Sequence, residues 1–101
     1  MAFVRAAKTT EITPGTVQEI VVDGKSMALA NVEGKFYAIN NTCVHRGGPL
    51  GQGTLAGTVL TCPWHGWEYD VVTGKACQNP AVGVGSYTIV VRGEDIFVDV
   101  G

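Results

Sequence analysis

Two short segments of this 101-residue chain each pair a cysteine with a histidine, and they constrain the fold more than any other feature. The first segment is Cys-Val-His at residues 43–45, and the second is Cys-Pro-Trp-His at residues 62–65. Together they contain both histidines and two of the three cysteines of the chain. Soft thiolates and borderline imidazoles grouped in this way are typical of a transition-metal site. The sequence therefore predicts four metal ligands, namely Cys43, His45, Cys62 and His65.

The region that carries these pairs, about residues 41–70, is rich in glycine and proline. Such a segment supplies little apolar core, so bound metal is the expected source of its order. We expect short strands around 58–61 and 67–69 within it. The sequence thus predicts a single domain over 1–101, with a base of residues 1–40 and 71–101 and an inserted cluster-binding subdomain of about 41–70.

The rest of the chain has the pattern of a β-framework. Asp23-Gly24 and Glu33-Gly34 separate three predicted strands, at 19–22, 26–32 and 35–39. Near the C-terminus, alternating apolar residues predict a hairpin of strands 86–92 and 95–100 around a turn at Gly93 and Glu94. Helical periodicity is not evident in any stretch. The predicted fold class is all-β.

Composition excludes several classes of protein. The chain has 46% apolar and 16% charged residues, which is typical of a globular domain. Its net charge is −2 and its seven lysines and arginines are scattered, which argues against nucleic-acid binding. No apolar run is long enough for a membrane span, and the start lacks the order of a secretory signal. We expect a monomer in the reducing cytoplasm, with no nucleic-acid or membrane partner.

The spacing of the first pair bears on the metal. Only Val44 separates Cys43 from His45, whereas ligands of structural zinc sites usually have two to four residues between them. A tetrahedral Cys2His2 zinc site stays open. An equal split of thiolates and imidazoles also suits a two-iron, two-sulfide cluster, with two thiolates on one iron and two imidazoles on the other.

The two segments with their neighbours, Cys-Val-His-Arg-Gly at 43–47 and Cys-Pro-Trp-His-Gly-Trp at 62–67, resemble the signature of Rieske proteins, in the oxygenase-associated branch that includes small ferredoxins. The resemblance implies that Cys43 and Cys62 ligate the inner iron, and that His45 and His65 ligate the outer iron near the surface. It also implies an antiparallel β-sandwich or incomplete barrel with the cluster domain inserted. Neutral imidazoles leave the oxidised centre with about zero formal charge, which favours reduction relative to four-cysteine clusters.

The same resemblance implies a function. A stand-alone Rieske ferredoxin carries single electrons from a flavin-dependent NAD(P)H reductase to a terminal ring-hydroxylating oxygenase, and we expect partner contacts near His45 and His65. Both histidines are used by the cluster, so a mononuclear iron site with two histidines and a carboxylate cannot be assembled from what remains. We therefore expect an electron-transfer component and not an enzyme.

Four further positions place the chain within the family. By resemblance, Gly48 and Trp64 stand where members in quinol-oxidising complexes have a second pair of cysteines, which form a disulfide. Trp67 stands where those members have a serine that donates to a sulfide, while Tyr69 matches a tyrosine that donates to a ligand sulfur. Fewer donors to sulfur stabilise the reduced form less, so we predict the low-potential branch.

Three other functions remain compatible with the sequence. The chain is also compatible with the small Rieske subunit of a larger oxidoreductase complex. A structural zinc module and a cysteine hydrolase using Cys43 or Cys62 are the remaining two. The third cysteine, Cys77, lies outside both segments, and we expect a packed or partly exposed thiol there instead of a fifth ligand.

Overall fold

The computed structural model describes residues 2–44, 47–64 and 66–101, and in these residues regular structure consists of β-strands and two short 3-10 helices. This confirms the all-β class. The 3-10 helices are η1 (Thr9–Glu11) and η2 (Leu50–Gln52). The strands are β1 (Phe3–Lys8), β2 (Val17–Val22), β3 (Lys25–Val32), β4 (Lys35–Asn40), β5 (Thr54–Ala56), β6 (Val59–Thr61), β7 (Glu68–Asp70), β8 (Ser86–Tyr87), β9 (Ile89–Arg92) and β10 (Asp95–Asp99).

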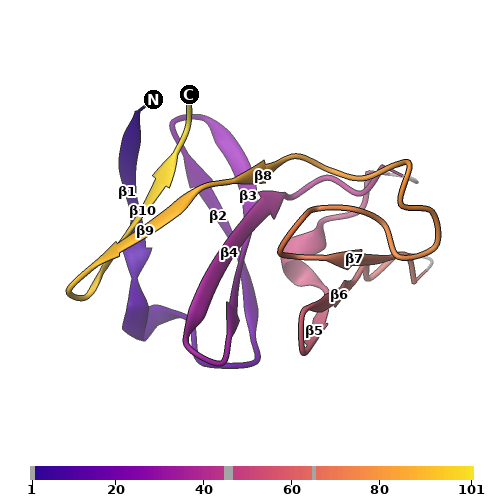
Figure 1. Cartoon of the computed structure of the whole chain (residues 1–101), viewed down its shortest axis with the longest axis horizontal. Coiled ribbons are helices and arrows are strands. Elements are labelled where there is room, and N and C mark those ends of the chain that lie inside the picture. Colours follow the sequence, from indigo (N-terminus) through magenta and orange to yellow (C-terminus); the bar gives the residue numbers. More distant parts are fainter. Residues whose placement is uncertain (1, 45–46, 65) are drawn as a thin grey trace.

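The strands form three antiparallel sheets, with the orders β1-β10-β9, β2-β3-β4-β8 and β5-β6-β7. Each sheet keeps open edges, so the described residues form no closed barrel. Figure 1 shows the β5-β6-β7 sheet at one end of the molecule and both chain termini at the opposite end. The site residues described below therefore lie away from the termini.

Strand β3 is central because both of its faces are buried. Alternate side chains of a strand point to opposite faces of the sheet. Met27 and Leu29 pack in one hydrophobic cluster, with residues of β1 and β10. Ala28 and Ala30 pack in a second cluster on the other face, which includes residues of β6 and β7. The middle sheet thus joins the terminal sheet to the part of the chain that carries the cysteines.

The predicted meander is confirmed, since β2, β3 and β4 pair in sequence. Its two turns are two-residue hairpin connections in which both residues have positive φ: 51° at Asp23 and 76° at Gly24, then 51° at Glu33 and 91° at Gly34. Two consecutive positive φ angles match the twist of paired strands, which explains why these dipeptides end one strand and begin the next.

The predicted C-terminal hairpin is confirmed in part. Strands β9 and β10 pair across the turn at Gly93 and Glu94. The expected continuous strand 86–92 is instead divided, because β8 pairs with β4 in the middle sheet while β9 pairs with β10. Corners of β-sandwiches are often formed by a strand that passes from one sheet to another. The alternation of apolar and polar residues does not reveal which neighbouring strand each half pairs with.

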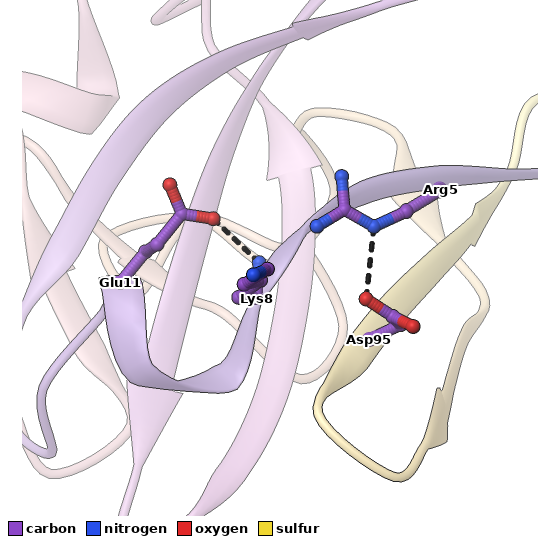
Figure 2. A network of polar contacts seen from close by, with 4 residues as sticks. All are labelled: Arg5, Lys8, Glu11 and Asp95. Carbon is purple, nitrogen blue, oxygen red and sulfur yellow. Dashed lines mark hydrogen bonds and ion pairs between the residues drawn. The ribbon is translucent and has the colours of Figure 1, made fainter.

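Sequence patterning did not predict β1, which pairs with β10. Its Phe3 and Val4 are exposed, so the segment lacks a clear buried face. Figure 2 shows how its end is fixed: Arg5 forms an ion pair of 2.9 Å with Asp95, and the Lys8 backbone N–H donates to the Glu11 carboxylate at 2.6 Å. Since Arg5 and Asp95 are about half exposed, their ion pair contributes at most about 1 kcal/mol.

Among residues 2–44, 47–64 and 66–101, no helix has both the length and the apolar character that a membrane span requires.

Candidate metal centre

The two thiols predicted as ligands are buried in the same hydrophobic cluster. Cys43 and Cys62 are each 2% exposed. Cys43 lies in the first loop, which we define as residues 41–52 between β4 and β5, and Cys62 begins the second loop, residues 62–67 between β6 and β7. Residues 19 positions apart in sequence thus bring two sulfur atoms into one interior site.

The environment of the Cys62 thiol opposes its charged form. Burial raises the pKa of the Cys62 thiol above its ordinary value, the Trp64 N–H partly offsets this, and the neighbouring Cys43 thiol raises that pKa further. A bound cation reverses this balance, because metal ligation removes the thiol protons. The pair is therefore suited to hold a metal group and poorly suited to act as exposed thiolate nucleophiles.

The other two predicted ligands, His45 and His65, lie outside the described residues, as does Arg46. Among the described residues, Cys43 and Cys62 are not joined by a third His, Cys, Asp or Glu that completes a metal-binding group. Residues next to the histidines in sequence are exposed: Val44 at 47% and Trp64 at 50%. In each loop the chain passes from a buried cysteine to an exposed residue within two positions.

Backbone hydrogen bonds shape the first loop around Cys43. The Cys43 N–H donates to the Gly48 carbonyl at 2.9 Å, and the Gly47 N–H donates to the Cys43 carbonyl at 2.8 Å. Gly47 has φ of 71°, a conformation that favours glycine. These contacts tie Cys43 to Gly47 and Gly48, and the Cys43 side chain is buried.

Gly48 is where the two loops meet. A Cβ atom at this position would lie 2.8 Å from the Cys62 sulfur and 3.1 Å from the Cβ and Cγ atoms of Trp64. Those distances are too short for any residue with a side chain, so glycine allows the first loop to approach the second.

Tyr69 of β7 supplies a polar contact at the buried sulfur. Its side chain is 0% exposed, and its hydroxyl lies 3.1 Å from Cys43 Sγ while accepting the Val44 N–H at 3.0 Å. Burial, and next the hydrogen bond with Cys43, raise the pKa of Tyr69 well above its ordinary value, so the hydroxyl keeps its proton. The tyrosine expected to donate to a ligand sulfur therefore lies against one of the two predicted sulfur ligands.

The second loop holds Cys62 in a similar way. The Cys62 N–H donates to the Trp67 carbonyl at 2.6 Å, and the Trp64 N–H points to Cys62 Sγ at 3.4 Å. Trp67 is half-buried and packs against the same hydrophobic cluster as the thiols. By contrast, half of the Trp64 surface is exposed.

Two observations concern residues outside the motif. Cys77 is exposed, with its N–H bonded to the Glu68 carbonyl at 2.8 Å, in agreement with an ordinary thiol. Sequence reasoning missed Asn41 and Glu19, whose side chains form a 2.6 Å hydrogen bond beside the first loop. The only signal for Asn41 was its place two residues before Cys43, and Glu19 gave none, because a strand glutamate usually faces solvent.

The donor set fits a cluster with sulfur at its core. Two buried thiols, a protonated hydroxyl and a backbone N–H converge in one place, and Gly48 leaves room beside them. Hydrogen-bond donors around thiolate and sulfide are how proteins tune iron–sulfur centres.

Comparison with known proteins identifies the family. Residues 2–90 match the family model of the Rieske [2Fe-2S] domain. The chain is 34% identical to the ferredoxin component of a naphthalene 1,2-dioxygenase system from Pseudomonas aeruginosa over 98 residues, covering 96% of this chain and 94% of that protein.

Solved structures agree. The ferredoxin of carbazole 1,9a-dioxygenase from Nocardioides aromaticivorans IC177 superposes with a TM-score of 0.90 at 30% identity, covering 97% of both chains. A ferredoxin chain from a complex of reduced oxygenase and oxidised ferredoxin in carbazole 1,9a-dioxygenase has a TM-score of 0.86 at 31% identity, covering 95% of this chain and 91% of that one. The chain therefore belongs to the Rieske [2Fe-2S] domain family, as a ferredoxin-type electron carrier with one Rieske-type cluster.

Proposed function

We propose that this chain takes single electrons from a flavin-dependent NAD(P)H reductase and passes them to a terminal oxygenase of the ring-hydroxylating type. The observation that carries the proposal is the match in both directions: the chain covers 94% of a dioxygenase ferredoxin component, and that match covers 96% of the chain. A relative of this kind is described in complex with its oxygenase, which supports the second half of the transfer.

Within this proposal, Cys43 and Cys62 hold the inner iron, and His45 and His65 hold the outer iron. Support comes from the burial of both thiols and from the exposure of residues adjacent to the histidines in sequence. We also infer that residues 41–70 are a cluster-binding subdomain, since they contain a sheet of their own, β5-β6-β7, between two stretches that build the other sheets.

The bound cluster supplies a centre that gains and loses one electron. The chain sets how readily it does so. The oxygen of the Tyr69 hydroxyl accepts the Val44 N–H. The hydroxyl proton is therefore available to donate to the Cys43 sulfur when that sulfur is a thiolate. The Trp64 N–H acts on Cys62 in the same sense over a longer distance, 3.4 Å. Each donor stabilises negative charge on sulfur and so favours the reduced state.

The docking surface of the proposal includes Val44 and Trp64, which are about half exposed and adjoin the predicted histidine ligands in sequence. Apolar and aromatic side chains are frequent in the centre of protein interfaces. A small contact of this type suits a carrier that must release each partner during turnover. We further propose that the carrier works as a monomer in the cytoplasm, where the cysteines stay reduced until the cluster is assembled.

The test is anaerobic electron transfer with purified components. The iron-loaded protein should show the visible spectrum of a Rieske cluster and, after dithionite reduction, an electron paramagnetic resonance signal with the low average g value of mixed nitrogen and sulfur ligation. A reductase should then reduce it, and it should reduce a ring-hydroxylating oxygenase. A colourless, zinc-containing protein would contradict the cofactor, and a chain found only in a stable larger complex on size-exclusion would contradict the free carrier.

A further inference from the structure

The first loop has two limbs, one that enters it at Asn41 and one that leaves it through residues 50–52. Hydrogen bonds to Asn41 join the two limbs. Its carbonyl accepts the Leu50 N–H at 2.7 Å, and its side-chain Oδ1 accepts the Gly51 N–H at 2.6 Å. Asn41 is 7% exposed, so these bonds form away from bulk water. Because Asn41 lies two residues before Cys43, its position limits where the Cys43 sulfur can be.

Glu19 on β2 holds both limbs with one carboxylate. Its Oε2 accepts from Asn41 Nδ2 at 2.6 Å on the limb that enters the loop, and its Oε1 accepts from Gln52 Nε2 at 2.8 Å on the limb that leaves it. The Asn41 amide also donates to Ser26 Oγ at 3.1 Å, on the neighbouring strand β3. The carboxylate therefore links the middle sheet to both ends of the loop.

Gly51 fixes the distance between the loop and β2. A Cβ atom on Gly51 would lie 2.8 Å from both the Cα and the N atoms of Glu19. The backbone of the loop thus rests directly on the backbone of the strand, and it cannot move closer. The hydrogen bonds to Glu19 keep it from moving away.

From these contacts we propose that Glu19 is a positioning residue for the metal centre: through Asn41 and Gln52 its carboxylate holds the first loop in the geometry that places Cys43 against Cys62. This proposal rests on the assignment of Cys43 as a ligand. Glu19 acts on the loop and is not itself a ligand. Partners that bond directly to a metal ligand typically change metal affinity by about ten- to a hundredfold, and Glu19 acts one contact further out, so its effect should lie at or below the lower end of that range.

The first test compares cluster release in Glu19→Ala and in Glu94→Ala, which removes an exposed carboxylate from the β9–β10 turn. With an iron chelator at 25 °C, we expect visible absorbance to decay faster in Glu19→Ala, by up to about tenfold, and at the wild-type rate in Glu94→Ala. The resonance signal of Glu19→Ala should broaden, because the loop samples more positions. Far-ultraviolet circular dichroism confirms that both variants are folded.

The second test uses hydrogen-bond complementarity. Asn41→Asp keeps an acceptor for the Gly51 N–H but sets a second carboxylate against Glu19, so the cluster should again be lost faster. Adding Glu19→Gln restores a donor opposite the new aspartate, so the double variant should recover slow release. Glu19→Gln alone should stay near wild type, since a reversed Gln52 amide offers its oxygen to the new amide group.

Release at the wild-type rate in Glu19→Ala, or no rescue in the double variant, would overturn the positioning role. Failure of the ligand assignment looks different: Cys43→Ala would then keep a normal Rieske signal, whatever the Glu19 variants do. If Glu19 served general stability only, Glu19→Ala would lower the melting temperature and leave the release rate and the resonance line shape unchanged, which also contradicts the proposal.

Discussion

The Tyr69 hydroxyl lies 3.1 Å from the Cys43 sulfur, on the buried side of the proposed cluster site. Tyr69→Phe removes this donor and keeps the ring. We expect the cluster to assemble and its reduction potential to fall by about 60 mV, which corresponds to a tenfold change in a one-electron equilibrium. Protein-film voltammetry measures the shift, and an unchanged potential would show that the hydroxyl does not donate to the sulfur. The Val44 N–H also loses its acceptor, so the stability should decrease slightly.

Gly48→Ala should disrupt the contact between the loops. The added methyl group would lie 2.8 Å from the Cys62 sulfur, so the loops must separate, at a cost of about 1–3 kcal/mol. We expect a lower iron content per chain after assembly, measured by colorimetric iron and sulfide assays. Gly85→Ala is the matched control, because a Cβ atom there meets nothing within 4 Å. Equal iron content in both variants would contradict the close approach at Gly48.

Substitution of a proposed ligand should have a different effect on the cluster from substitution of the third cysteine, Cys77. His45→Ala, His65→Ala and Cys62→Ser should each abolish the Rieske resonance signal, since each removes one of four ligands. Cys77→Ser should retain it, because Cys77 is exposed and outside the site. Resonance spectra of the reduced proteins, with iron analysis, decide each case. A normal signal in any of the first three would refute that ligand.

Trp64→Ala should affect partner binding more than the cluster. The side chain is half exposed, so its removal leaves the core intact. We expect a similar reduction potential and an approximately tenfold lower second-order rate of electron transfer to the oxygenase in stopped-flow measurements, as for loss of an interface anchor. Val91→Ala removes a comparably exposed apolar residue from β9, in the sheet that carries both termini (Figure 1), and should transfer at the wild-type rate. Equal rates in the two variants would place the docking surface elsewhere.

Asp99 should make stability depend on pH at the end of the molecule that carries the termini. Its carboxylate accepts the N–H groups of Ala2 and Gly101, and these bonds lower the pKa of Asp99 below its ordinary value of 3.8. A lowered pKa in the folded state means that the stabilisation is present above the ordinary value and is lost as the pH falls through the folded one. Asp99→Ala should therefore unfold more readily than wild type at pH 7, and this difference should shrink in acid. Denaturant unfolding at both pH values measures it, and a difference that grows in acid would reverse the sign.

Particular residues show what patterning can reveal. The dipeptides Asp23-Gly24 and Glu33-Gly34 predicted the meander. Hairpin turns need positive φ angles, and few residue types adopt these angles readily. Tyr69 was singled out through the family resemblance, and its contact with Cys43 then appeared in the structure. By contrast, β1 has an exposed Phe3 and depends on β10 for its pairing, so its strand conformation is not visible in its own residues.

The sequence by itself determined the ligand types, their spacing, the β-framework and hence the family, because turn chemistry and metal-ligand chemistry depend on residue identity over short distances. Only the tertiary structure decided that Gly48 lies against Cys62, that the strand at 86–92 divides between two sheets, and that Glu19 bonds to Asn41. These are contacts between residues that are far apart in the chain. Their partners are set by how the sheets pack, a property that no single segment contains.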